Sequence, residues 1–119
     1  MSCFWDGLRS KLKITHVDNV TFVKHLQSQN TSTHTGKVLW NKIKLTKQCR
    51  LEHYHHIKHY DLAQINHGYL CSSCDAFLVL ICALFQTNIH HNFNGNVMTY
   101  ELPSATSTIY CQSNSNHFY

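Results

Sequence analysis

Acidic residues, proline and glycine are all scarce in this chain of 119 residues. Asp and Glu together number six, there is one proline, and the four glycines are scattered, which excludes a glycine-rich phosphate loop. Lys and Arg number ten, and a formal charge of +4 without a basic cluster gives no indication of nucleic-acid binding. We therefore expect a globular protein with no nucleic-acid partner.

Long apolar runs are also missing. The longest, residues 76–85, is about half of what a membrane span needs, so we expect no membrane insertion. The N-terminus is polar and shows no secretory signal, and Cys82 lies in the apolar run, where a thiol behaves as a small hydrophobe. We therefore expect the six cysteines to be reduced and the protein to be cytoplasmic.

The length and an apolar share of 43% suit one domain, residues 1–119, which we expect to be a monomer. Apolar residues at positions 4, 8 and 12 predict a first helix, and Thr15 with Asp18 resembles a capping box for a second one. Residues 27–35 are polar and predict a loop. The histidine-rich residues 51–60 show no clear period and predict a loop with a short helix.

The last third of the chain has a clearer pattern. Residues 76–85 are apolar on all sides, which is typical of a buried helix, and Ser72 with Asp75 has the chemistry of its N-terminal cap. Asn94-Gly95 between strand-like residues 88–93 and 96–101 predicts a β-hairpin, and residues 108–111 predict a further strand. Helices followed by strands predict an α+β fold.

A cysteine and a histidine near the two ends of the chain form a candidate catalytic pair. Cys3 begins the first predicted helix, where the positive end of the helix dipole stabilises a thiolate. His117 follows the last predicted strand, which could hold its imidazole against that thiol. Phe4 and Trp5 are expected to be core anchors rather than substrate contacts.

Three segments carry a resemblance to a known family. They are CFWDGLR at residues 3–9, FLVLICALF at 77–85 followed by the Asn-Gly hairpin, and NHFY at 116–119. In this order they resemble the OTU (ovarian tumour) family of cysteine proteases, as a truncated or divergent member of viral or mobile-element type. The resemblance implies a papain-like OTU core, with helices packed on a small antiparallel sheet.

The same resemblance implies a function. It predicts a thiol-dependent deubiquitinase without a cofactor, in which Cys3 is the nucleophile, His117 the general base, and ubiquitin or a ubiquitin-like protein the partner. The chain departs from the family pattern in two places. Only Met1 and Ser2 precede Cys3, where the family has an acidic residue, and Tyr119 stands where many members place the Asp or Asn that orients the histidine. The activity is therefore expected to be reduced.

A zinc-stabilised binding module is an alternative from a different class. Cys49 and His53 are four residues apart, and Cys71 and Cys74 form a Cys-x-x-Cys pair, which together supply the four ligands of a tetrahedral zinc site. The remaining histidines are expected to be solvated. A third possibility is an OTU-like fold that binds ubiquitin without cleaving it.

Overall fold

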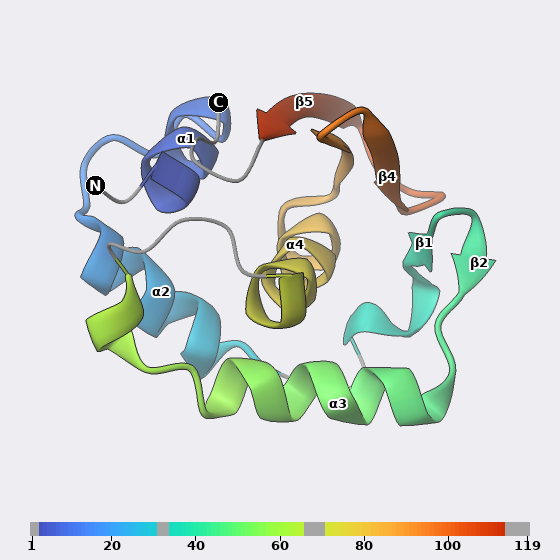
Figure 1. Cartoon of the computed structure of the whole chain (residues 1–119), viewed down its shortest axis with the longest axis horizontal. Helices are drawn as coiled ribbons and strands as arrows, with labels where there is room; N and C mark the ends of the chain where they lie inside the picture. The colour runs from blue at the N-terminus through green and yellow to red at the C-terminus, as the bar shows by residue number, and fades with distance from the viewer. Residues whose placement is uncertain (1–2, 31–33, 66–70, 114–119) are drawn as a thin grey trace.

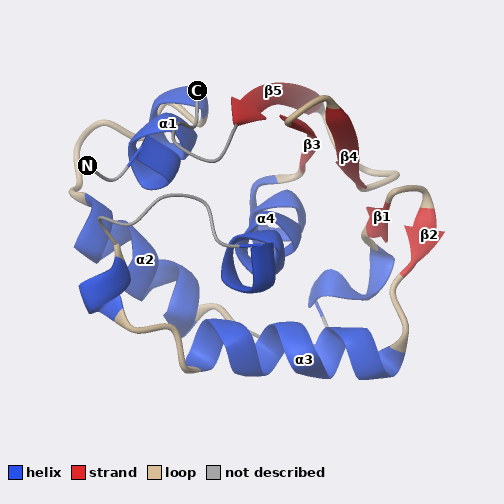
Figure 2. Cartoon of the chain, viewed as in Figure 1, coloured by secondary structure: helices blue, strands red, loops and turns tan. Residues whose placement is uncertain are grey.

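The computed structural model describes residues 3–30, 34–65 and 71–113, and shows an α+β fold (Figures 1 and 2). The α-helices are α1 (Cys3–Lys11), α2 (Asn19–Ser28), α3 (Lys47–Lys58) and α4 (Cys71–Phe85), and the short 3-10 helices are η1 (His34–Lys37) and η2 (Leu62–Gln64). The strands are β1 (Leu39–Trp40), β2 (Ile43–Lys44), β3 (Thr87–Phe93), β4 (Asn96–Glu101) and β5 (Ser107–Ser113). The α+β class predicted from the sequence is thus confirmed at this level.

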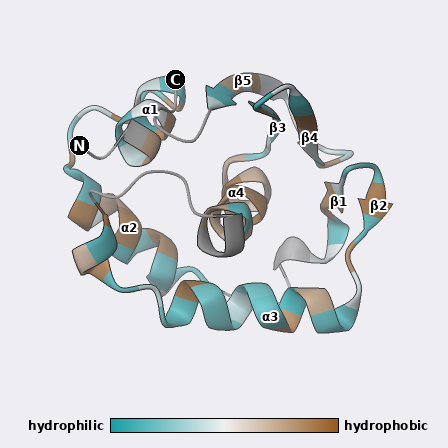
Figure 3. Ribbon diagram, viewed as in Figure 1, coloured by the Kyte–Doolittle hydropathy of each residue, from teal (hydrophilic) through white to brown (hydrophobic). Residues whose placement is uncertain are grey.

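Helix α4 is the centre of the core. Every residue from 76 to 82 has an exposed fraction of 0%, which confirms the predicted buried helix. Figure 1 shows α4 nearly end-on, with α1, α2, α3 and the sheet around it, and Figure 3 shows that its apolar surface contrasts with the hydrophilic ribbon of α3. The helix ends where Gln86 adopts a positive φ of 52° and donates from Nε2 to the carbonyl oxygen of Ala83 at 2.8 Å.

The sheet is mixed, so the predicted antiparallel sheet needs correction. Its strand order is β2-β1-β4-β3-β5, and β3 pairs in parallel with β5, with Thr87 opposite Ser107 and Phe93 opposite Ser113. The cause lies in residues 102–106, which cross the start of β3 and bring the chain to its other edge. Hydrogen bonds hold this crossing: Thr106 N–H donates to the Gln86 carbonyl at 3.1 Å, and Leu102 N–H to Asn88 Oδ1 at 2.8 Å.

The predicted β3–β4 hairpin is confirmed. Asn94 and Gly95 have φ values of 50° and 88°, the left-handed conformation that a two-residue hairpin turn requires. Gly95 N–H also donates to Asn92 Oδ1 at 2.9 Å. A second, very short hairpin, β1–β2, extends the sheet, and Asn41 in its turn exchanges hydrogen bonds with the backbone of Thr99 at 2.7 and 2.9 Å.

Three predicted helix boundaries are wrong. Helix α4 begins at Cys71, so Ser72 lies inside it rather than at its cap. Of the predicted loop and short helix at residues 51–60, residues 51–58 belong to the continuous helix α3. Thr46 caps this helix by accepting from Cys49 N–H at 3.1 Å, and a histidine, His53, takes a core position that interrupts the apolar period. The cap of α2 is Asp18 rather than Thr15, since the Asp18 carboxylate accepts from Thr21 N–H at 2.8 Å. None of the helices in the described ranges is long and apolar enough to cross a membrane.

Candidate functional site

Helix α1 carries the predicted nucleophile at its first position. Phe4, Trp5 and Leu8 are buried, at 1%, 1% and 0% exposure, and fix the first turns of the helix against α4 and α2. The structure places Cys3 at the N-terminus of this anchored helix and does not describe its side chain. Phe4 and Trp5 are core anchors, as predicted.

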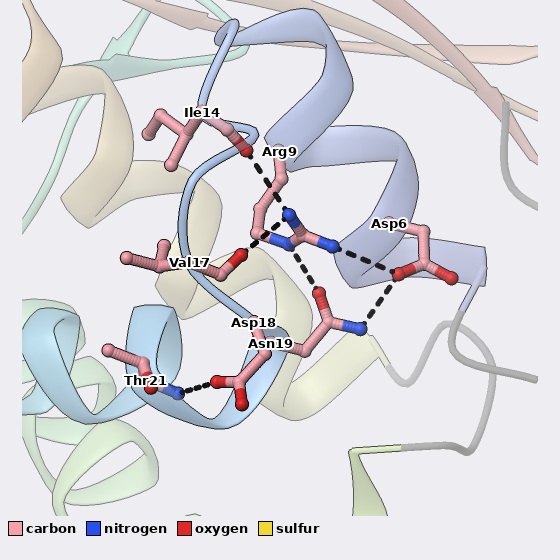
Figure 4. Close-up of polar contacts among 7 residues, drawn as sticks. All are labelled: Asp6, Arg9, Ile14, Val17, Asp18, Asn19 and Thr21. Atoms are coloured by element: carbon pink, nitrogen blue, oxygen red, sulfur yellow. Dashed lines mark hydrogen bonds and ion pairs between the residues drawn. The ribbon is translucent and has the colours of Figure 1, made fainter.

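A polar network that the sequence analysis missed joins α1 to the start of α2 (Figure 4). Arg9 donates from Nε to Asn19 Oδ1 at 2.6 Å and from Nη1 to the carbonyl of Val17 at 2.8 Å. Asn19 donates from Nδ2 to Asp6 Oδ1 at 2.8 Å, and the Arg9 guanidinium lies 3.4 Å from the same carboxylate. The i, i+3 spacing of Asp6 and Arg9 was the available signal. The network holds the helix that bears Cys3 at several points along one side.

Strand β5 leads toward the predicted general base. Burial raises the pKa of the Cys111 thiol in β5 to about 11. The Lys11 ammonium at the end of α1 opposes this rise by a smaller amount. In Figure 1 the arrowhead of β5 points toward α1. His117 comes four positions after Ser113, the last residue of β5, and lies outside the described residues.

The end of β5 is held by two hydrogen bonds at Ser113. Its hydroxyl lies 2.6 Å from Nε2 of His91, a completely buried residue of β3, and its carbonyl accepts from Asn94 N–H at 3.0 Å. Burial lowers the pKa of His91 to about 4, so the imidazole is neutral at neutral pH. The strand that precedes His117 is therefore fixed in position by the hairpin beside it.

Half of the alternative zinc set comes together in the structure. Cys49 Sγ and His53 Nε2 are 3.7 Å apart on α3, as their spacing predicts. Burial is the largest cause that raises the pKa of the Cys49 thiol, and the nearby Glu52 raises it further. Burial is also the largest cause that lowers the pKa of His53, and the nearby His56 lowers it further. The pair is thus a neutral thiol beside a neutral imidazole, which is the opposite of an activated thiolate.

The other half of the zinc set lies elsewhere. Cys74 is buried in α4 and influences the pKa of Tyr60, which follows the end of α3, whereas Cys49 lies in the first turn of that helix. The side chain of Cys71, the first residue of α4, is not described. Within the described residues there is no group of three His, Cys, Asp or Glu side chains placed to hold a metal ion. The predicted cap residue Asp75 instead accepts from the Tyr100 hydroxyl at 3.0 Å.

The four described thiols, Cys49, Cys74, Cys82 and Cys111, form no disulfide with one another. We expect Cys82 to resist iodoacetamide in the folded protein at pH 7.5, because burial raises its pKa to about 12 and its exposed fraction is 0%. Half-buried Cys49 is expected to react faster than Cys82. Peptide mass spectrometry after timed labelling measures both rates, with the chain unfolded in guanidinium as the control. Equal labelling of Cys82 and Cys49 in the folded chain would contradict the burial.

Comparisons with protein-family models, with curated proteins and with solved structures find no match. A functional assignment for this chain therefore rests on its own residues. The features available are Cys3 at the start of a firmly packed helix, and a strand that points toward this helix and is held at its last residue by hydrogen bonds.

Proposed function

We propose that the chain is a thiol-dependent deubiquitinase, a cysteine isopeptidase that acts on ubiquitin or a ubiquitin-like modifier. The observation that carries the proposal is the direction of β5, whose arrowhead points toward α1 (Figure 1), because the strand leads the chain toward the helix that begins with Cys3. Four residues of chain span at most about 14 Å, which limits the distance between His117 and the end of β5. The finer fold assignment, a papain-like OTU core, belongs to the same proposal.

The chemistry proposed for this pair is acyl transfer through a thioester. His117 accepts the proton of the Cys3 thiol, and the thiolate attacks the carbonyl carbon of the modifier's C-terminal glycine. As the C–N bond of the isopeptide breaks, His117 returns that proton to the leaving lysine amine. Water then attacks the thioester, gives a proton to His117, and releases the modifier's carboxylate with the regenerated thiol.

Local electrostatics support Cys3 over the other described thiols as the nucleophile. A thiol in the first turn of a helix experiences the positive end of the helix dipole, which favours the thiolate. Cys49 also lies in the first turn of a helix, α3, but burial and then Glu52 raise its pKa, and burial raises the pKa values of Cys82 and Cys111 as well, which disfavours all three thiolates. The Cys49–His53 pair is therefore a matched control for the proposed pair, since it combines the same two residue types at close range.

The test is reaction of the full chain with ubiquitin that carries an electrophile at its C-terminus, followed by intact mass measurement. The wild type is expected to form a covalent adduct, Cys3→Ala none, and His117→Ala an adduct formed about 10²-fold to 10⁴-fold more slowly. Cys49→Ala, the control, is expected to react at the wild-type rate. A parallel set with an electrophile on a ubiquitin-like modifier identifies the preferred modifier.

Two outcomes would overturn the proposal. An adduct that persists in Cys3→Ala would assign the reactivity to another thiol. A folded wild type that forms no adduct with any modifier would exclude the activity, and ubiquitin binding without an adduct would then identify an inactive binder.

A further inference from the structure

Four side chains of the types that ligate metals lie on the solvent-facing side of α3. Glu52, His55, His56 and His59 stand at i, i+3, i+4 and i+7, a spacing that places them on one helix face, and all four are exposed. The core side of the same helix is occupied by His53 and Ile57. The four exposed residues therefore have no role in packing the core.

These side chains line a cavity of about 470 Å³ together with Tyr60, Asp61 and Gln64. The rings of His55 and His59 are stacked, with their centroids 6.0 Å apart and their planes within 5° of parallel, so the two side chains lie side by side. Zn–N bonds of about 2.0–2.1 Å place two imidazoles of one tetrahedral ion roughly 5 Å apart between ring centres. Because a ring nitrogen binds a metal in the plane of its ring, at least one of the two stacked imidazoles has to turn to bind the same ion.

The carboxylates of this cavity already accept hydrogen bonds, whereas its imidazoles are available to bind a metal ion. Glu52 accepts from Gln48 Nε2 at 3.1 Å, and Asp61 accepts from Ala63 N–H at 2.9 Å as the cap of η2. In the part of the chain that the structure describes, the rings of His55 and His59 contact each other and make no hydrogen bond. No group of three His, Cys, Asp or Glu side chains in the described residues is placed to hold a metal ion, so side-chain rotation and water have to complete a site around these two imidazoles.

We propose that His55 and His59 bind a divalent late first-row transition metal ion, such as Ni²⁺ or Zn²⁺, in the cavity on the exposed face of α3. Glu52 or His56, each within one helical turn of the pair, and water complete the coordination. Imidazole nitrogen suits these ions, whereas Mg²⁺ and Ca²⁺ prefer oxygen ligands, so the site discriminates between the two groups of metals. It is separate from the proposed catalytic pair and from the Cys49–His53 contact.

The test is calorimetric titration of the tag-free full chain with Ni²⁺ and with Zn²⁺. Alanine replaces the exposed residues His55 and His59 without loss of helix propensity, and circular dichroism confirms that the variants fold. His59→Ala and His55→Ala are each expected to lower the affinity at least about tenfold, because even residues that only support a metal ligand contribute 10–100-fold. Millimolar Mg²⁺ is expected not to compete.

Two controls separate this site from other metal-binding groups. The double variant His16→Ala/His25→Ala removes two exposed histidines on another surface and is expected to bind within twofold of the wild type. Cys49→Ala is expected to bind likewise. Unchanged affinity in His59→Ala would overturn the proposal. An equal loss in the double control, or a loss confined to Cys49→Ala, would also overturn it by placing the ion elsewhere.

Discussion

Replacing Trp5 with alanine is expected to lower the free energy of unfolding by about 3–5 kcal/mol, the usual cost of removing a large buried aromatic side chain. Trp5 is 1% exposed, and its ring packs edge-on against Phe4 and Phe77, each at 4.9 Å, and against Tyr60 at 6.0 Å. It also donates from Nε1 to the Tyr60 hydroxyl at 3.2 Å. One side chain thus joins α1, α4 and the segment that follows α3.

Urea denaturation measures this fall in the free energy of unfolding. Two further variants isolate the hydrogen bond and provide a control at an exposed position. Tyr60→Phe removes only the hydroxyl that accepts from Trp5 and is expected to cost about 1 kcal/mol. Val20→Ala, at a position with 38% exposure, is expected to stay within about 0.5 kcal/mol of the wild type. If Trp5→Ala costs no more than Val20→Ala, the core does not depend on this side chain.

Trp5 also bears on the proposed activity because it is two positions from Cys3 in the same helix. A milder replacement, Trp5→Phe, keeps an aromatic ring and removes the hydrogen bond to Tyr60. The adduct rate of this variant is compared with its free energy of unfolding. A fall in both indicates a loss of folded protein, whereas a fall in the adduct rate alone indicates that α1 is displaced.

Elements with strong local signals could be predicted from the sequence. Helix α4 was predictable because residues 76–82 are apolar on all sides, and no surface helix tolerates that composition. The β3–β4 hairpin was predictable because Asn94 and Gly95 both accept positive φ. In each case the local preference and the tertiary environment favour the same structure.

Elements that depend on tertiary contacts could not be predicted. Helix α3 escaped prediction because its inner face uses a histidine, His53, which packs on Trp40 at 5.5 Å. The parallel pairing of β5 depends on how residues 102–106 cross Gln86 and Asn88, and no periodicity in the sequence encodes that path. The cap of α2 is Asp18 rather than Thr15 because the Asp18 carboxylate is the group that meets the N–H of Thr21.

The candidate site was predictable only in part. Local spacing correctly paired Cys49 with His53, because residues four apart meet on a helix. The distance between that pair and Cys74 depends on how α3 and α4 pack, which spacing does not reveal. The pairing of Cys3 with His117 stays a prediction, and the buried contact between His91 and Ser113, which holds the strand leading to His117, had no signal in the sequence.

Acidification is expected to destabilise the folded protein through His91. Its pKa is about 4 in the folded chain, because burial disfavours the charged imidazolium, against about 6.5 when unfolded. The stability due to the neutral form is fully present above pH 6.5 and is lost as the pH falls toward 4, since the unfolded chain binds a proton that the folded chain excludes. The loss reaches about 3 kcal/mol at most. His53, whose pKa burial also lowers, contributes in the same direction.

Urea denaturation at pH 7.5 and pH 4.5 tests this with His91→Leu. The variant is expected to be less stable than the wild type at pH 7.5, because the Ser113 hydroxyl loses its contact with Nε2. Its further loss on acidification should be smaller than that of the wild type by about 2–3 kcal/mol. His90→Asn, at the half-buried neighbouring position, is expected to keep the wild-type pH dependence. If His91→Leu loses as much stability as the wild type on acidification, the proton that destabilises the fold binds elsewhere.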